Sequence, residues 1–142
     1  MSQAELPPFK SVLMRRASEG ATADQLAAMI ADVWLEIHYA LSPIIGQRGA
    51  AALYKRSLHL GSSSHAWLQS VSAGAASEMD LGALRQGLSG RAPADAAAAG
   101  ATLLHSFHDL VGSLIGPSLS AQLLGPVWVN FFSGSAAQDP SA

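Results

Sequence analysis

The sequence predicts an all-α protein, because three features of its 142 residues agree. Apolar residues recur at the three- and four-residue spacing of amphipathic helices, and no segment alternates with the two-residue period of a strand. β-branched residues, which favour strands, are sparse. One stretch also returns in degraded form 70 residues later. We therefore expect a helical bundle of four main helices, built from two helix-glycine-helix repeats, with an N-terminal helical arm and short connector helices.

The composition predicts a domain whose apolar surface is partly covered by a partner. The chain is 49% hydrophobic and only 13% charged, whereas about 25% charged is usual. Because so few charges are left to solvate the surface, we expect a second copy of the chain to cover part of it. The net charge is −2 and the Lys and Arg residues are scattered, which argues against nucleic acid as a partner. The absence of cysteine excludes disulfides and thiolate metal sites.

The N-terminal residues predict a cytoplasmic protein. They contain an acid and two prolines where a signal peptide needs a basic start and an apolar run. Residues 110–138 carry no charge and are long enough to span a bilayer. Glycines, prolines and polar residues interrupt that run, so we expect a buried pair of helices there and no membrane partner.

Residues 1–21 are predicted to form the N-terminal helical arm. Phe9, Val12 and Leu13 lie on one face of a short helix that ends near Gly20. We expect this helix to pack on the bundle as an arm or lid.

The duplicated bundle is expected to cover residues 22–132, and its first repeat residues 22–60. Thr22 is predicted to cap the first helix, because its hydroxyl can accept a hydrogen bond from a free backbone N–H of the first turn. Pro43 lacks an N–H and its ring clashes with the preceding turn, so a kink is expected there. Gly46 is predicted to complete the break before the second helix.

The connector is expected to cover residues 61–92, with one or two short helices. The second repeat follows at residues 93–132, where Pro93 suits a first helical turn. Glycine and proline at 116–117 and at 125–126 predict a break and a bend. Residues 133–142 are small and polar, and we expect a disordered tail.

The two repeats align without a gap. His38 falls on His108 and Gly46 on Gly116, and eight of the 37 positions from 22 to 58 are identical to those 70 residues later. Either duplication or convergent patterning of two core helices explains the match. If the repeats pack about a two-fold axis, the two imidazoles would face each other.

Residues 38–44, His-Tyr-Ala-Leu-Ser-Pro-Ile, resemble the H-box of histidine-kinase dimerisation domains, where a helical phosphoacceptor histidine precedes a Ser/Thr-Pro-aliphatic kink. His108-Asp109-Leu110 is similar to the opening of the same box, and Gly112-Ser113 to the Gly-Ser of histidine phosphotransfer domains. The resemblance implies that His38 and His108 are the phosphoacceptors.

The resemblance is incomplete in both repeats. Tyr39 stands where the family has an acid that helps the imidazole act as nucleophile. Val111 stands where phosphotransfer domains carry a lysine, and no nucleotide-binding glycine boxes follow. The chain is therefore not expected to phosphorylate itself.

A metal or haem site is the second interpretation of the histidines. His105, His108 and Asp109 share one helix face, and Asp32 or Glu36 would complete a ligand set. The Glu-x-x-His pattern of di-iron bundles is absent, however, and no haem attachment motif is present. We predict neither metal nor cofactor. In the third interpretation both histidines are interior residues that bond to backbone carbonyls or line an apolar pocket.

Two further groups are candidate binding residues. Aromatic and histidine side chains are candidates for the lining of an apolar pocket, and they are Trp34, Tyr39, His105 and Phe107. Basic residues that lead into a Gly-Ser loop are candidates for binding an anion at a helix start, and they are Arg48, Lys55, Arg56 and His59.

These observations predict a non-enzymatic regulatory or interaction module in cytoplasmic signalling. It would act as a homodimer through the apolar faces of the helices that bear the histidines, with a kinase or receiver protein as a possible partner. The alternatives are a histidine phosphotransfer protein and a helical sensor that binds an apolar or haem-type ligand. No catalytic residues are predicted.

Overall fold

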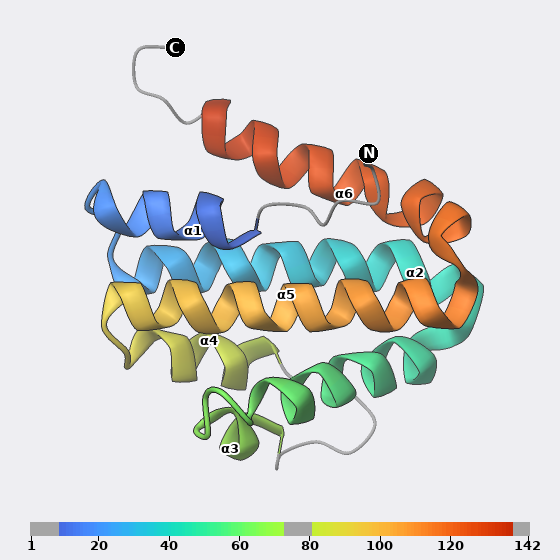
Figure 1. Cartoon of the computed structure of the whole chain (residues 1–142), viewed down its shortest axis with the longest axis horizontal. Coiled ribbons are helices and arrows are strands. Elements are labelled where there is room, and N and C mark those ends of the chain that lie inside the picture. Colours follow the sequence, from blue (N-terminus) through green and yellow to red (C-terminus); the bar gives the residue numbers. More distant parts are fainter. Residues whose placement is uncertain (1–8, 73–80, 138–142) are drawn as a thin grey trace.

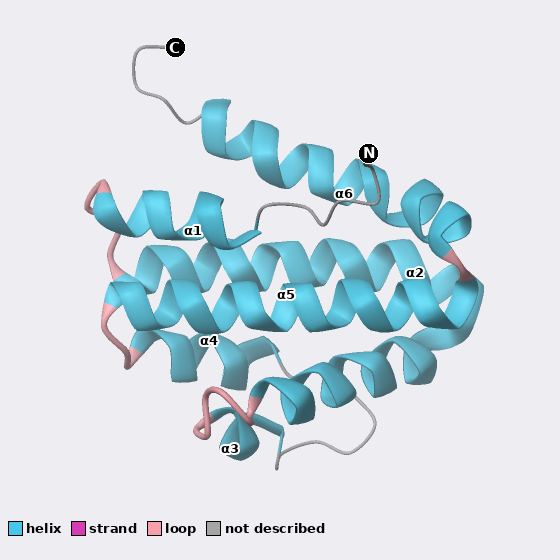
Figure 2. Cartoon of the chain, viewed as in Figure 1, coloured by secondary structure: helices cyan, strands magenta, loops and turns pink. Residues whose placement is uncertain are grey.

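A computed structural model describes residues 9–72 and 81–137 of the chain, and that part is helical throughout apart from short turns (Figures 1 and 2). No strand occurs in these residues, so the all-α prediction is confirmed. The helices are α1 (Phe9–Ser18), α2 (Ala23–Gly61), α3 (Leu68–Ser72), α4 (Leu81–Ser89), α5 (Pro93–Ile115) and α6 (Pro117–Ala137).

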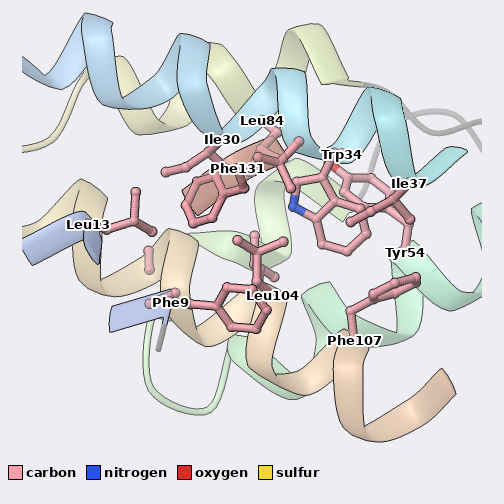
Figure 3. Packing of buried hydrophobic residues seen from close by; sticks show 14 of the residues in the cluster. Phe9, Leu13, Ile30, Trp34, Ile37, Tyr54, Leu84, Leu104, Phe107 and Phe131 are labelled. Carbon is pink, nitrogen blue, oxygen red and sulfur yellow. The ribbon is translucent and has the colours of Figure 1, made fainter. Parts of the chain in front are cut away.

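The first part of α2 and the whole of α5 form the centre of the fold. They lie side by side and run in the same direction (Figure 1). Trp34 of α2 packs edge-on against Phe107 of α5 and against Tyr54, with 4.9 Å between ring centroids in both pairs (Figure 3). All three rings are buried. The apolar stripes of the two histidine-bearing helices therefore pack within the chain.

The other helices surround this pair. α1 packs chiefly on α5, and α4 on α2. The second part of α2 and the helix α6 both turn back from the end where the central helices finish, and they do so on opposite sides of the pair (Figure 1). α1 is part of the core rather than a lid, since Phe9 and Leu13 are buried.

Two glycines make the turns at that end. Gly46 has φ 83° and ψ 161°, and Gly116 has φ 89° and ψ 152°. A positive φ of this size is open to glycine at little cost. The two glycines thus terminate the central helices with nearly the same backbone conformation.

The two predicted proline effects are wrong. α2 continues through Pro43 to the break at Gly46, and α6 continues through Pro126. A proline in a helix leaves the carbonyl four residues earlier without its N–H donor. Those carbonyls belong to Tyr39 and Gln122, which are exposed, so water can take the place of the missing donor.

Other predictions have mixed outcomes. Thr22 caps α2 in a capping box with Gln25, as the two reciprocal hydrogen bonds of 2.9 and 3.1 Å show. The disordered tail is wrong for residues 133–137, which extend α6. Residues 138–142 of that tail, 1–8 of the arm and 73–80 of the connector lie outside the described residues.

The burial of side chains follows the 70-residue spacing. Residues 37–45 have the same burial, position by position, as residues 107–115, and residues 52–61 match residues 122–131 in the same way. The spacing fails on one helix face. Asp32, Leu35 and Glu36 are exposed, whereas the residues 70 positions later, Thr102, His105 and Ser106, are half-buried. One face of α2 is thus open where the corresponding face of α5 is covered.

The tightest packing lies where α2 and α5 meet. A Cβ atom placed on Gly100 would overlap Cδ1 of Ile30 and lie 2.9 Å from its Cγ1. It would also lie 3.6 Å from Cδ1 of Leu13 on α1. Glycine at position 100 therefore lets three helices approach one another.

We predict that Gly100→Ala destabilises the protein by about 1–3 kcal/mol relative to Gly112→Ala, because it overpacks the contact with Ile30. Gly112 lies on the same helix and has no atom within 4 Å of a Cβ placed there, so it is the matched control. Its replacement should stabilise the helix by up to about 1 kcal/mol.

Urea denaturation measures both variants. Adding Ile30→Val should recover part of the loss in Gly100→Ala, since it removes the Cδ1 atom that the new methyl group meets first. Equal effects of the two alanine substitutions would contradict the packing argument.

Candidate functional site

A pocket of about 610 Å³ opens between the end of α1, the first part of α2 and α6. It lies on the open face of α2, because Asp32 and Glu36 are part of its wall. Its lining residues come from three segments far apart in the sequence. They are Arg16, Glu19, Gly20, Ala21, Gln25, Ala28, Met29, Asp32, Val33, Glu36, Asn130 and Phe131.

The pocket combines an apolar wall with an acidic border. Met29, Val33 and Phe131 supply apolar surface. The ionisable side chains are three carboxylates and one guanidinium, so the lining carries a net negative charge. Such a surface favours a ligand with a large apolar group and positive charge.

His38 contacts residues of its own helix. Its Nε2 and Nδ1 atoms lie 3.4 and 3.5 Å from the Ser42 hydroxyl oxygen, and its ring packs edge-on against Tyr39 with centroids 5.8 Å apart. The imidazole is half-buried. His38 is therefore held by a hydroxyl group rather than by an acid.

His108 lies beside aromatic side chains of other helices. Its ring centroid is 6.4 Å from Phe9 of α1 and 6.2 Å from Trp128 of α6. Burial lowers the pKa of His108 below its ordinary value of 6.5, and His105 lowers it further, while Asp109 acts in the opposite direction. Its Nδ1 atom is buried without a hydrogen-bond partner. Among the described residues, no contact brings His38 and His108 together.

The four pocket candidates lie elsewhere in the fold. Trp34 and Phe107 are fully buried in the core, Tyr39 is exposed, and His105 packs near Phe9 with centroids 6.4 Å apart. None of them lines the pocket. Aromatic residues at helical spacing here fill the core.

The basic residues lie along the second part of α2. Arg48, Arg56 and His59 are exposed and Lys55 is half-buried. The Gly-Ser loop that follows ends α2, since the hydroxyls of Ser62 and Ser63 donate to the carbonyls of His59 and Leu60. A helix C-terminus carries partial negative charge, which favours these cations and repels an anion.

No group of three or more His, Asp or Glu side chains within the described residues is placed to hold a metal ion. Asp32 and Glu36 line the pocket, whereas His105 and His108 pack against Phe9. The ligand set that joins these residues is therefore not assembled.

Sequence reasoning missed the pocket. The exposed acids Asp32 and Glu36, one helical turn apart, were its only local signal. The position of α6, which supplies Asn130 and Phe131, has no such signal.

Comparison of the chain with protein-family models, with curated proteins and with solved structures finds no match. Within the described residues, α2 alone is long and apolar enough to cross a membrane, by length and composition, and 33% of its most apolar window is buried in the chain. Core helices of soluble proteins pass the same test.

We predict that the free energy of unfolding falls as the pH is lowered below 6.5, and that His108 contributes to this fall. The unfolded chain binds a proton at His108 near pH 6.5, whereas the folded chain binds it only at lower pH, so acid favours unfolding.

Urea denaturation between pH 7.5 and 5 measures the effect. His108→Gln should show a smaller loss of stability over this range than wild type, and the control His59→Gln, at an exposed position, should behave as wild type. An unchanged pH dependence in His108→Gln would show that His108 is not desolvated.

Proposed function

We propose that the protein is a non-enzymatic regulatory and interaction module of cytoplasmic signalling, built from two helix-glycine-helix repeats, that acts as a homodimer. The observation that carries the proposal is the exposure of Ile44 and Leu114, at 54% and 61%. These residues occupy the last turns of the two central helices, 70 positions apart in the sequence. Exposed apolar surface on a chain with so little charge is typical of an interface.

The proposed interface lies at the end of the helix pair. The stripes of α2 and α5 are occupied within the chain, so their faces are not available to a second copy. Because the two helices run in the same direction, Ile44 and Leu114 belong to the same end of the molecule (Figure 1). Leu119, 38% exposed, lies in the first turn of α6 at that end. We call these three residues the turn-end patch.

A two-fold interface uses each residue twice, once from each copy. Full burial of an Ile or Leu side chain contributes about 1.5–3 kcal/mol, so a small patch can decide the oligomeric state. The apolar residues of the patch adjoin partly buried Ile45 and Ile115, which extend the same surface towards the core.

We predict a homodimer at micromolar concentration that Ile44→Asp with Leu114→Asp converts to the monomer of 14.6 kDa. Burial of the introduced carboxylates would be costly, which favours dissociation. Multi-angle light scattering measures the mass. Val129→Asp is the control, since Val129 is 62% exposed on α6 and lies outside the patch.

Two results would overturn the homodimer. One is a wild-type mass near 14.6 kDa at micromolar concentration. The other is dissociation by Val129→Asp to the same extent as by the double variant. Circular dichroism of each variant tests whether the helices remain folded.

Phosphotransfer is the alternative that His38 allows, because this imidazole is only half-buried. His108 is covered by Phe9 and Trp128. The hydroxyl of Ser42 beside His38 cannot act as the carboxylate base that would assist attack on a phosphoryl group.

We therefore predict that the chain gains no acid-labile phosphate when it is incubated with a receiver protein that carries a labelled aspartyl phosphate. Labelling that is lost in His38→Gln and retained in His59→Gln would contradict this prediction and establish phosphotransfer.

A further inference from the structure

The pocket corresponds to a surface that the chain itself covers in its other half. Counting 70 residues on from Asp32 and Val33 leads to Thr102 and Leu103 of α5, and counting 70 back from Phe131 leads to Gly61. Gly61 also packs on this part of α5, since a Cβ placed on it would lie 3.4 Å from Cδ2 of Leu103 and 3.7 Å from Cγ2 of Thr102. The same three positions thus meet in both halves.

In the covered half, the segment that follows Gly61 folds onto α5. Nε2 of His65 lies 3.4 Å from Oγ1 of Thr102. The Trp67 ring packs on Gly87 of α4, so closely that a Cβ there would lie 2.7 Å from its Cζ3 atom. The guanidinium of Arg91 lies 4.5 Å from the centre of the same ring. Leu68 is fully buried behind these contacts.

In the open half, the chain takes a different course. α6 continues as a helix beyond Phe131 as far as Ala137, instead of turning as the chain does after Gly61. The corner between α1 and α2 lines the pocket with Arg16, Gly20 and Ala21, as the corner between α4 and α5 contacts Trp67. The wall that receives His65 and Trp67 in one half is therefore a pocket in the other.

We infer that this pocket is a docking site for a partner protein, which inserts a short basic segment with a tryptophan anchor. The segment 62–71 of this chain shows the shape that the wall accepts. Charge fixes the difference: Asp32 and Glu36 stand where α5 has Thr102 and Ser106, so the open pocket is acidic where the covered surface is neutral. The inference names the partner of the proposed interaction module, and a monomeric chain would bind it equally.

Segments of this chain fit the pocket poorly. Residues 1–8 and 138–142 contain Glu5 and Asp139 and no Lys or Arg, so their side chains would be repelled by the acidic border. A second copy offers no exposed tryptophan, since Trp34 and Trp128 are buried and Trp67 is half-buried. A separate protein is the occupant that charge and shape favour.

The test uses fluorescein-labelled peptides that copy residues 62–71, SSSHAWLQSV, with His65→Lys, which places an ammonium group opposite Asp32. Fluorescence anisotropy should show saturable binding to the full-length protein that weakens as salt rises. The same peptide with Trp67→Ala should bind more than about tenfold more weakly, because a buried tryptophan dominates such contacts. A His65→Glu peptide should also bind more weakly.

Protein variants locate the site. Asp32→Asn with Glu36→Gln should weaken binding of the lysine peptide by about fivefold or more, because two charge pairs are lost. Asp109→Asn, an exposed acid on α5 outside the pocket, is the matched control and should bind as wild type. These exposed positions are replaced without change of the core, so the variants remain folded.

No saturable binding of the lysine peptide would overturn the inference, as would equal binding by the pocket variant and the control. Binding of a second copy, seen as self-association lost in Asp32→Asn with Glu36→Gln and retained in Ile44→Asp with Leu114→Asp, would also overturn it. Light scattering on the same samples separates this outcome from failure of the homodimer, which depends on the turn-end patch.

Discussion

The fold depends on the close approach of Ile30 and Gly100. These two residues are 70 positions apart, and they touch each other across the boundary between α2 and α5. In a two-fold arrangement, a residue can meet its own counterpart only on the axis. Two isoleucines would overfill that position and two glycines would leave a void, and either fault destabilises a close-packed core. An isoleucine opposite a glycine fills the space and makes the two halves different at their centre.

Much of the remaining architecture follows from this contact. Helices packed this closely and in the same direction must finish at the same end, where each needs a residue that can turn the chain sharply. Gly46 and Gly116 supply the same backbone conformation there, and the following helices return on opposite sides of the pair (Figure 1). The turn-end patch is a consequence of this geometry, because the last turns of two parallel helices have no helix beyond them to cover Ile44 and Leu114.

The features that the sequence predicts correctly are those that depend on near neighbours. Thr22 and Gln25 cap α2 through residues three apart, and the helical stripes reflect spacing along one helix. The proline rule failed at Pro43 and Pro126 because the cost of a lost hydrogen bond depends on whether water reaches the freed carbonyl, which is a property of the folded surface. The pocket was missed for a similar reason. Its walls come from three helices, and the phase of apolar residues along α6 does not say which face of α2 that helix leaves open.

The histidines show how equivalent positions acquire different properties. His38 and His108 have similar burial, yet one bonds to Ser42 of its own helix and the other packs between Phe9 and Trp128. Packing requires only that the apolar positions of the two halves match, and they do. It makes no demand on exposed positions, so carboxylates at Asp32 and Glu36 are not needed for the fold. Where two halves share a core and differ in one acidic, concave face, the difference is the place to look for a partner. This argument assigns recognition to the open face of α2 rather than to the histidines.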